Sequence, residues 1–132
     1  MIPMRLLVID DDPDLVTSVT TVMENAGWEV HSAPNGVEGL EKARQLLPEL
    51  IILDVLMPRK DGLTTYEELR ADTSLRAIPI IMLTSAGEKL GFGFSGSDMA
   101  AHYGHQPEAF LQKPFDPRHL VETARRVTRP RG

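Results

Sequence analysis

The chain has 132 residues, a length typical of one domain, and we expect a single domain over residues 1–132. It contains no cysteine, which excludes disulfides and thiolate chemistry, and its net charge of −5 argues against a nucleic-acid-binding surface spread over the domain. It has no apolar run near the roughly 20 residues of a membrane helix, and the start Met1–Arg5 leaves no room for a signal peptide. We therefore expect a cytoplasmic protein that does not bind membranes.

Short apolar runs alternate along the chain with stretches whose apolar residues recur at helical spacing. Residues 6–9 form a short apolar run that predicts a buried strand. The apolar stripe from Leu15 to Ala26 predicts a helix that Asp12-Pro13 begins and Gly27 ends. Residues 28–33 alternate between apolar and polar side chains, which indicates a second, less buried strand.

The same alternation continues to the end of the chain. Helices are expected over 37–47, 63–69 and 120–127, and strands over 50–53, 78–83 and 109–111. Gly39 weakens the first of these helices, and Pro79 is tolerable only near the beginning of its strand. Strands that alternate with helices predict a doubly wound α/β fold, a mostly parallel sheet covered on both faces.

Two stretches need separate interpretation, residues 87–104 and the basic C-terminal end. Residues 87–104 contain five of the ten glycines, and we expect a flexible loop followed by a short helix near 97–103. The basic end contains Arg125, Arg126, Arg129 and Arg131. We interpret it as a solvated helix end, where cations suit the helix dipole, in preference to a nucleic-acid-binding tail.

Reactive side chains follow four of the five expected strands: Asp10-Asp11, Asp54, Thr84 and Lys113. Parallel strands end at one edge of the sheet, where such folds bind ligands, so these residues are expected to lie together. Residues 28–33 end with nothing reactive, which fits a strand at the edge of the sheet.

Carboxylates gathered at one edge repel one another, and a hard divalent cation removes that conflict. Oxygen ligands without histidine or cysteine favour Mg²⁺ over zinc. A nearby lysine invites an anion, so the set as a whole predicts a phosphoryl-transfer site.

Each residue alone has a simpler explanation. Asp10 to Asp12 could be a capping run, and Asp12 is better explained as a cap than as a ligand. Asp54 alone could be a turn residue, Thr84 the start of a helix, and Lys113 a solvated charge. Only their joint occurrence at strand ends favours a functional site.

These residues also lie in motifs that resemble the receiver domain of bacterial two-component response regulators, from about residue 5 to residue 127. The motifs are Leu7–Asp12, Leu53–Pro58 with Asp61-Gly62, Met82–Ser85 and Lys113-Pro114-Phe115. The resemblance implies a flavodoxin-like sheet of five parallel strands in the order 2-1-3-4-5.

The resemblance also implies the roles of the acidic residues. Asp54 would be the phosphoacceptor. Asp11, Asp54 and the backbone carbonyl of Leu56 would bind Mg²⁺, and Asp10 would act mainly through the water around the ion.

For the remaining residues, the resemblance implies that Lys113 pairs with the phosphoryl oxygens and that the Thr84 hydroxyl reorients to bond one of them. Phe110 occupies the aromatic switch position, without the hydroxyl of the commoner tyrosine. The Lys113-Pro114 bond would be cis, aiming the ammonium group inward.

A receiver of this kind would take its phosphoryl group from a sensor histidine kinase or a phosphotransfer protein and signal by binding a downstream protein. It would catalyse its own phosphorylation without being an enzyme that turns over a separate substrate. The resemblance also implies that the residues two positions after Asp54 and Thr84 flank the path of the attacking water. Here they are Leu56 and Ala86, whose apolar side chains cannot hydrogen-bond that water, which predicts slow self-dephosphorylation.

The segment between Thr84 and Lys113 is longer than the family leads us to expect. Within it, Phe92 and Phe94 either tuck onto the core, which we favour, or contact a partner. His102 and His105 are interpreted as surface residues rather than metal ligands.

Three rival functions fit the sequence less well. A dehalogenase-type aspartyl-phosphate hydrolase needs an acid two residues after its nucleophile, where this chain has Leu56. A degenerate receiver that only binds partners is disfavoured by the intact Asp11, Asp54, Thr84 and Lys113. A nucleotide-binding protein would have a glycine-rich turn in place of Asp10–Pro13.

Overall fold

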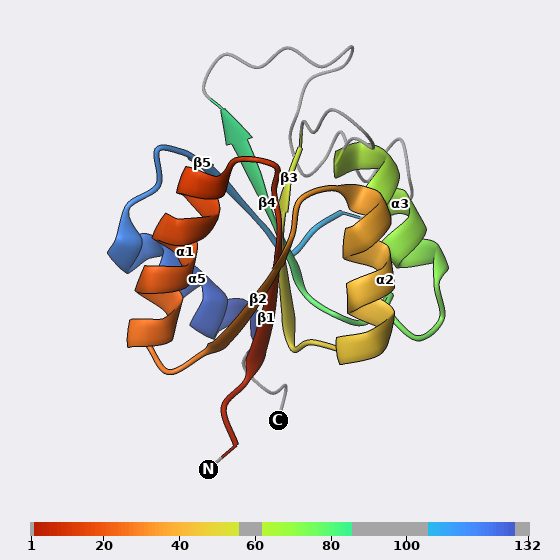
Figure 1. The fold of residues 1–132 in the computed structure, drawn as a ribbon, viewed down its shortest axis with the longest axis horizontal. Helices are drawn as coiled ribbons and strands as arrows, with labels where there is room; N and C mark the ends of the chain where they lie inside the picture. Colours follow the sequence, from red (N-terminus) through yellow and green to blue (C-terminus); the bar gives the residue numbers. More distant parts are fainter. Residues whose placement is uncertain (1, 56–61, 86–105, 129–132) are drawn as a thin grey trace.

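The fold is a three-layer α/β sandwich (Figure 1). The computed structural model describes residues 2–55, 62–85 and 106–128. Seen edge-on, the sheet separates α1 and α5 on one side from α2 and α3 on the other (Figure 1). The doubly wound α/β class predicted from the alternating pattern is confirmed.

All pairings in the sheet are parallel, and the strand order is β2-β1-β3-β4-β5, as predicted. The strands are β1 (Arg5–Ile9), β2 (Glu29–Ala33), β3 (Leu50–Asp54), β4 (Ile80–Ser85) and β5 (Ala109–Lys113). β2 lies at the edge and is less buried than β1 and β3, as its alternating sequence indicated.

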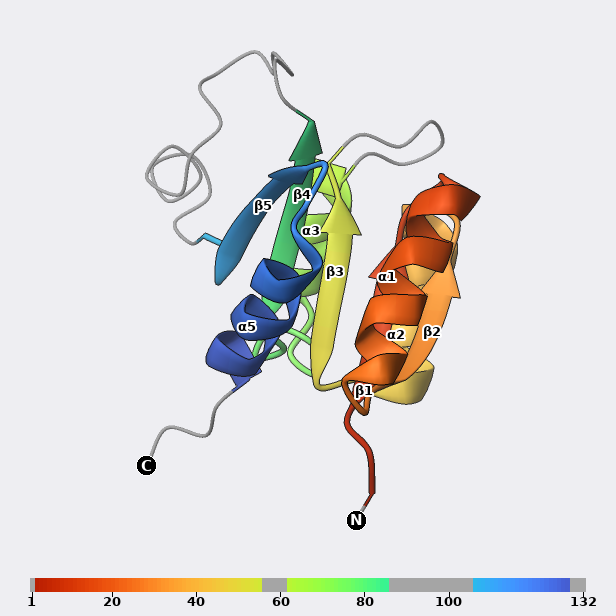
Figure 2. The ribbon, with the colours of Figure 1, turned by 90° about the vertical axis from the view of Figure 1, so that its left-hand side faces the viewer.

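The helices cover the two faces in pairs. They are α1 (Pro13–Asn25), α2 (Gly36–Leu46), α3 (Gly62–Ala71) and α5 (Pro117–Thr128). Figure 2 shows α1 and α5 in front of the sheet, with α2 and α3 behind it. No helix within the described residues is long and apolar enough to cross a membrane.

Alternate residues of each central strand supply two separate cores. Leu6 and Val8 belong to the core beneath α1 and α5, which we term the α1/α5 core. Leu7 and Ile9 belong to the core beneath α2 and α3, termed the α2/α3 core. Successive side chains of a strand point to opposite faces of the sheet, so the face of each side chain at a strand end follows from its position in the strand.

Local signals in the sequence explain where the helices begin and end. The Asp12 side chain accepts a hydrogen bond from the Asp14 amide as the N-cap of α1, and Pro13 occupies the first turn. Gly27, just beyond the helix, has a φ of 96°, a conformation that glycine adopts without strain. Asp12 is therefore a cap, as expected.

Two details of the prediction needed correction. β4 begins at Ile80, two residues later than expected, because Pro79 has no amide hydrogen to donate to the ladder; its carbonyl still accepts from Ile51. β5 is longer than expected and continues to Lys113.

Gly39 does not break its helix. A Cβ atom at this position would lie 2.6 Å from Cδ1 of Ile9, so the glycine allows α2 to approach β1 closely.

Some predictions fall outside the described residues. They are the helix near 97–103, the Leu56 carbonyl, and the proposed roles of Ala86, Phe92, Phe94, His102, His105, Arg129 and Arg131.

Candidate functional site

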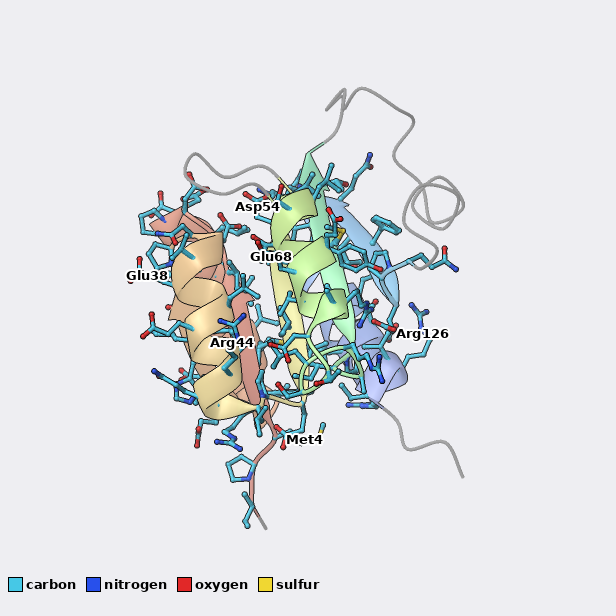
Figure 3. The ribbon with its side chains drawn as sticks, turned by 90° about the vertical axis from the view of Figure 1, so that its right-hand side faces the viewer. Met4, Glu38, Arg44, Asp54, Glu68 and Arg126 are labelled. Atoms are coloured by element: carbon cyan, nitrogen blue, oxygen red, sulfur yellow. The ribbon has the colours of Figure 1, made fainter. Side chains whose placement is uncertain are left out.

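The candidate site lies at the carboxyl ends of the parallel strands. Figure 3 shows Asp54, the last residue of β3, at the end of the sheet opposite Met4, which precedes β1. Asp10 directly follows β1, and Lys113 ends β5. The edge predicted from strand direction is therefore where these residues meet.

The three aspartates form a compact cluster. One carboxylate oxygen from each of Asp10, Asp11 and Asp54 lies within 4.8 Å of the others. Asp10 and Asp54 are buried, at 2% and 3% exposure, whereas Asp11 is exposed. The cluster thus has a buried base and an open side.

Lys113 joins this cluster through an ion pair with Asp54, in which Nζ lies 3.0 Å from Oδ1. The alternation of the strands explains the contact. Asp54 follows Ile52 by two residues and Lys113 follows Leu111 by two, and both apolar residues belong to the α1/α5 core. Their side chains therefore share one face of the sheet.

Burial makes the charge on Asp10 costly. Desolvation, reinforced by the neighbouring charges of Asp54 and Asp11, raises the pKa of Asp10 to about 7. The Asp12 amide, which donates to Asp10 Oδ1 at 2.9 Å, and the Lys113 charge lower that pKa only in part. The other oxygen, Oδ2, is buried and has no hydrogen-bond partner among the described residues.

These observations fit a hard divalent cation. The donors are all carboxylate oxygens, the set favoured by Mg²⁺, and Asp10 contributes a buried oxygen that has no hydrogen-bond partner among the described residues. A cation bound here would offset the repulsion among the carboxylates and would favour the charged form of Asp10, whose pKa is raised mainly by burial.

Thr84 and Phe110 lie on the other face of the sheet. Phe110 is paired with Met82 across β4 and β5 and packs against the α2/α3 core, and Thr84 follows Met82 by two residues. Thr84 and Phe110 therefore share a face with each other, but not with the carboxylate of Asp54 or with Lys113. The structure brings together Asp10, Asp11, Asp54 and Lys113, and it places Thr84 beside that group at the strand ends.

Two further predictions concern the surroundings of the site. The Lys113-Pro114 peptide bond is cis, as expected. The Leu56 carbonyl lies outside the described residues.

Sequence reasoning missed the contact that Gly62 makes behind Asp54. The Asp61-Gly62 motif gave no indication of this contact, in which Gly62 packs directly against the backbone of Asp54 and Val55. A glycine that permits close packing cannot be distinguished by sequence from a glycine that permits a turn.

The model of the response regulator receiver domain family matches residues 6–125. The chain therefore belongs to this family, the receiver domains of the response regulators of two-component systems. The resemblance carried by the four motifs is confirmed.

Individual relatives agree with this assignment. The DNA-binding dual master transcriptional regulator RpaA of Synechocystis sp. is 37% identical over 125 residues, covering 95% of this chain and 49% of that protein. A response-regulator crystal structure from Chloroflexus aurantiacus has a TM-score of 0.84 and 32% identity, covering 98% of this chain and 100% of that one.

A third similar structure, the receiver domain of a sensor histidine kinase of Pseudomonas aeruginosa, has a magnesium ion coordinated in its active-site cleft. It has a TM-score of 0.80 and 23% identity and covers 96% of this chain and 98% of that one, which supports the fold alone.

The chain spans about half the length of the curated relatives it matches, with 49%, 52% and 50% covered in three of them. Receiver domains interact with histidine kinases and downstream effectors.

Proposed function

We propose that this protein is a phosphorylation-controlled switch that accepts a phosphoryl group on Asp54. The observation that carries the proposal is the Lys113 ammonium group, 3.0 Å from Asp54 Oδ1 within a cluster of three carboxylates. Asp54 has a nucleophilic carboxylate oxygen at the carboxyl edge of the sheet. Lys113 supplies the positive charge that an incoming phosphoryl group requires.

Asp10, Asp11 and Asp54 would hold Mg²⁺. The ion would neutralise the clustered carboxylates and the charge on the phosphoryl group during transfer. The all-oxygen donor set supports this choice of metal.

The donor would be a phosphohistidine of a sensor kinase or phosphotransfer protein. As the P–N bond of the donor breaks, a P–O bond to an Asp54 carboxylate oxygen forms, and the imidazole is left behind. Lys113 would then exchange its contact with Asp54 for one with the phosphoryl oxygens, which are its stronger partners.

Phosphorylation would add a charge of about −1.5 to −2 and three strong acceptor oxygens. Thr84 can donate its hydroxyl hydrogen to one of them by turning toward Asp54 at the strand ends. Because Thr84 and Phe110 share a face, this movement would change the packing beside Phe110 and favour one of two surface conformations. A downstream protein would bind that surface, and the chain would turn over no separate substrate.

The test is the intact mass of the protein after incubation with acetyl phosphate and Mg²⁺. Wild type should gain one phosphoryl group, and Asp54→Asn should gain none. Asp72→Asn, a surface change in the turn after α3, should behave as wild type. No mass increase in wild type, or an equal increase in Asp54→Asn, would contradict the proposal.

A further inference from the structure

Gly62, the first residue of α3, lies directly behind the proposed phosphoacceptor. A Cβ atom on Gly62 would lie 2.0 Å from the carbonyl oxygen of Asp54 and 2.6 Å from Cα of Val55. Real Cβ atoms essentially never come within 3.0 Å of a heavy atom outside their neighbouring residues. A side chain at this position would therefore force a displacement of about 1 Å.

The atoms that meet this Cβ belong to the backbone, so no side-chain rotation can relieve the contact. Val55 is also held in place, because its amide donates to the Leu83 carbonyl at 3.1 Å and its side chain is fully buried. In addition, the Gly62 amide donates to the Val55 carbonyl at 2.6 Å and ties the start of α3 to the end of β3. Either α3 or the Asp54-Val55 peptide would have to move.

Gly62 and the carboxylate of Asp54 lie on opposite sides of the Asp54 backbone. α3 lies on the side of the α2/α3 core (Figure 1). Asp54 follows Ile52 of the α1/α5 core by two residues, so its side chain belongs to the face of α1 and α5. A displacement of about 1 Å is large compared with the tolerance of a 3.0 Å ion pair. If the Asp54-Val55 peptide takes up the displacement, Asp54 is misaligned with Lys113 and with the other two carboxylates.

We propose that Gly62 is a positioning residue for the phosphorylation of Asp54: its lack of a side chain lets α3 hold the Asp54 peptide at the place where the carboxylate meets Asp10, Asp11 and Lys113. The inference rests on the proposed function and assigns to Gly62 a role in placing the phosphoacceptor.

Gly39 provides a matched control on the same side of the sheet. Its Cβ would lie 2.6, 2.9 and 3.0 Å from Cδ1, Cγ1 and Cγ2 of Ile9, all of them side-chain atoms and none of them backbone. Gly39→Ala therefore adds the same methyl group to a helix packed on the sheet, without pressing on the backbone of Asp54.

The experiment compares wild type, Gly62→Ala and Gly39→Ala in two measurements. They are the rate of phosphorylation by acetyl phosphate at saturating Mg²⁺ and donor, per folded molecule, and the Mg²⁺ affinity by calorimetry. We expect Gly62→Ala to be about 100-fold slower, since a displacement of this size costs roughly that factor, and to bind Mg²⁺ more weakly. Gly39→Ala should stay within about threefold of wild type, because lost stability alone lowers the folded fraction and not its rate.

A folded Gly62→Ala protein with the wild-type rate and Mg²⁺ affinity would overturn the inference. Failure of wild type itself to accept a phosphoryl group would instead overturn the proposed function. In that case the Mg²⁺ affinities still decide whether Gly62 positions the carboxylates.

A second measurement on wild type decides the matter if Gly62→Ala does not fold. Hydrogen exchange of the Gly62 amide, which bonds to Val55, should slow by about fivefold or more when Mg²⁺ is added, because coupling between two sites is reciprocal. The Gly39 amide, which donates to the carbonyl of Asn35, the N-cap of α2, should not change. Equal effects at both glycines, or none at either, would refute the role of Gly62.

Discussion

Asp10 shows how one residue can be costly for the fold and useful for the site. Its side chain is buried, one of its oxygens has no hydrogen-bond partner among the described residues, and its pKa is raised from 3.8 to about 7. The folded protein therefore binds this proton more tightly than the unfolded chain does. Asp10 contributes stability below about pH 4, and that contribution is lost as the pH rises through about 7.

The first prediction concerns Asp10→Asn without metal. The stability of wild type relative to this variant should fall by about 2 kcal/mol between pH 5 and pH 8, as Asp10 loses its proton in the folded protein. Urea unfolding in EDTA, followed by the fluorescence of Trp28, measures both proteins. Two pH profiles that run in parallel would show that Asp10 does not titrate in this range.

At the residue scale, the sequence was sufficient to identify Asp10, Asp11, Asp54 and Lys113 as neighbours. Parallel strands end together, and counting by twos along a strand also gives the face of each side chain. The raised pKa of Asp10 and the contact of Gly62 with Asp54 could not be obtained in this way. Both depend on how closely other segments pack, which no local pattern encodes.

Between elements, the buried side chain of Arg70 connects segments that are distant in sequence. Its Nη2 lies 2.6 Å from Glu108 Oε1, and Nη1 donates to the carbonyls of Arg76 and Ile78 at 2.8 and 3.0 Å. The guanidinium also lies over the Tyr66 ring, 5.2 Å from its centre. Arg70 thus joins α3 to the turn before β4 and to the start of β5.

We predict that Arg70→Met destabilises the fold by about 2 kcal/mol, because the Arg76 and Ile78 carbonyls lose their donor and Glu108 keeps only the Ile80 amide as a partner. Arg44→Met is the matched control: Arg44 pairs with Asp72 at 3.1 Å, but its side chain is 56% exposed, compared with 7% for Arg70. The control should cost less than about 1 kcal/mol. Urea unfolding measures both, and equal losses would contradict the prediction.

The elements themselves were largely predictable because their signals are local. Asp12-Pro13 and Gly27 bound α1 as expected, and apolar runs gave the positions of β1 and β3. The start of β4 was misplaced because an apolar residue before Pro79 resembles a strand residue until hydrogen bonds are counted. The pairing of Arg70 with Glu108 spans 38 residues and has no local signature.

At the scale of the whole molecule, one sheet serves both cores. β1, β3 and β4 each contribute alternate residues to the α1/α5 core and to the α2/α3 core. Neither core can lose its packing while these strands keep theirs, so the described parts of the domain should unfold as one cooperative unit. A ligand that stabilises one end of the sheet should then stabilise the other end equally.

Trp28, the only tryptophan, allows this cooperativity to be tested from a distance. It precedes β2 at the end of the sheet opposite Asp54 and packs against the α1/α5 core. Mg²⁺ bound among the aspartates at 100 times its Kd should raise the free energy of unfolding by about 2.7 kcal/mol. Because the sheet is shared, Trp28 fluorescence and far-ultraviolet circular dichroism should report the same shift in urea midpoint, and Asp54→Asn should show a smaller one. A midpoint shift seen by circular dichroism but not by Trp28 would mean that the two ends of the sheet unfold separately.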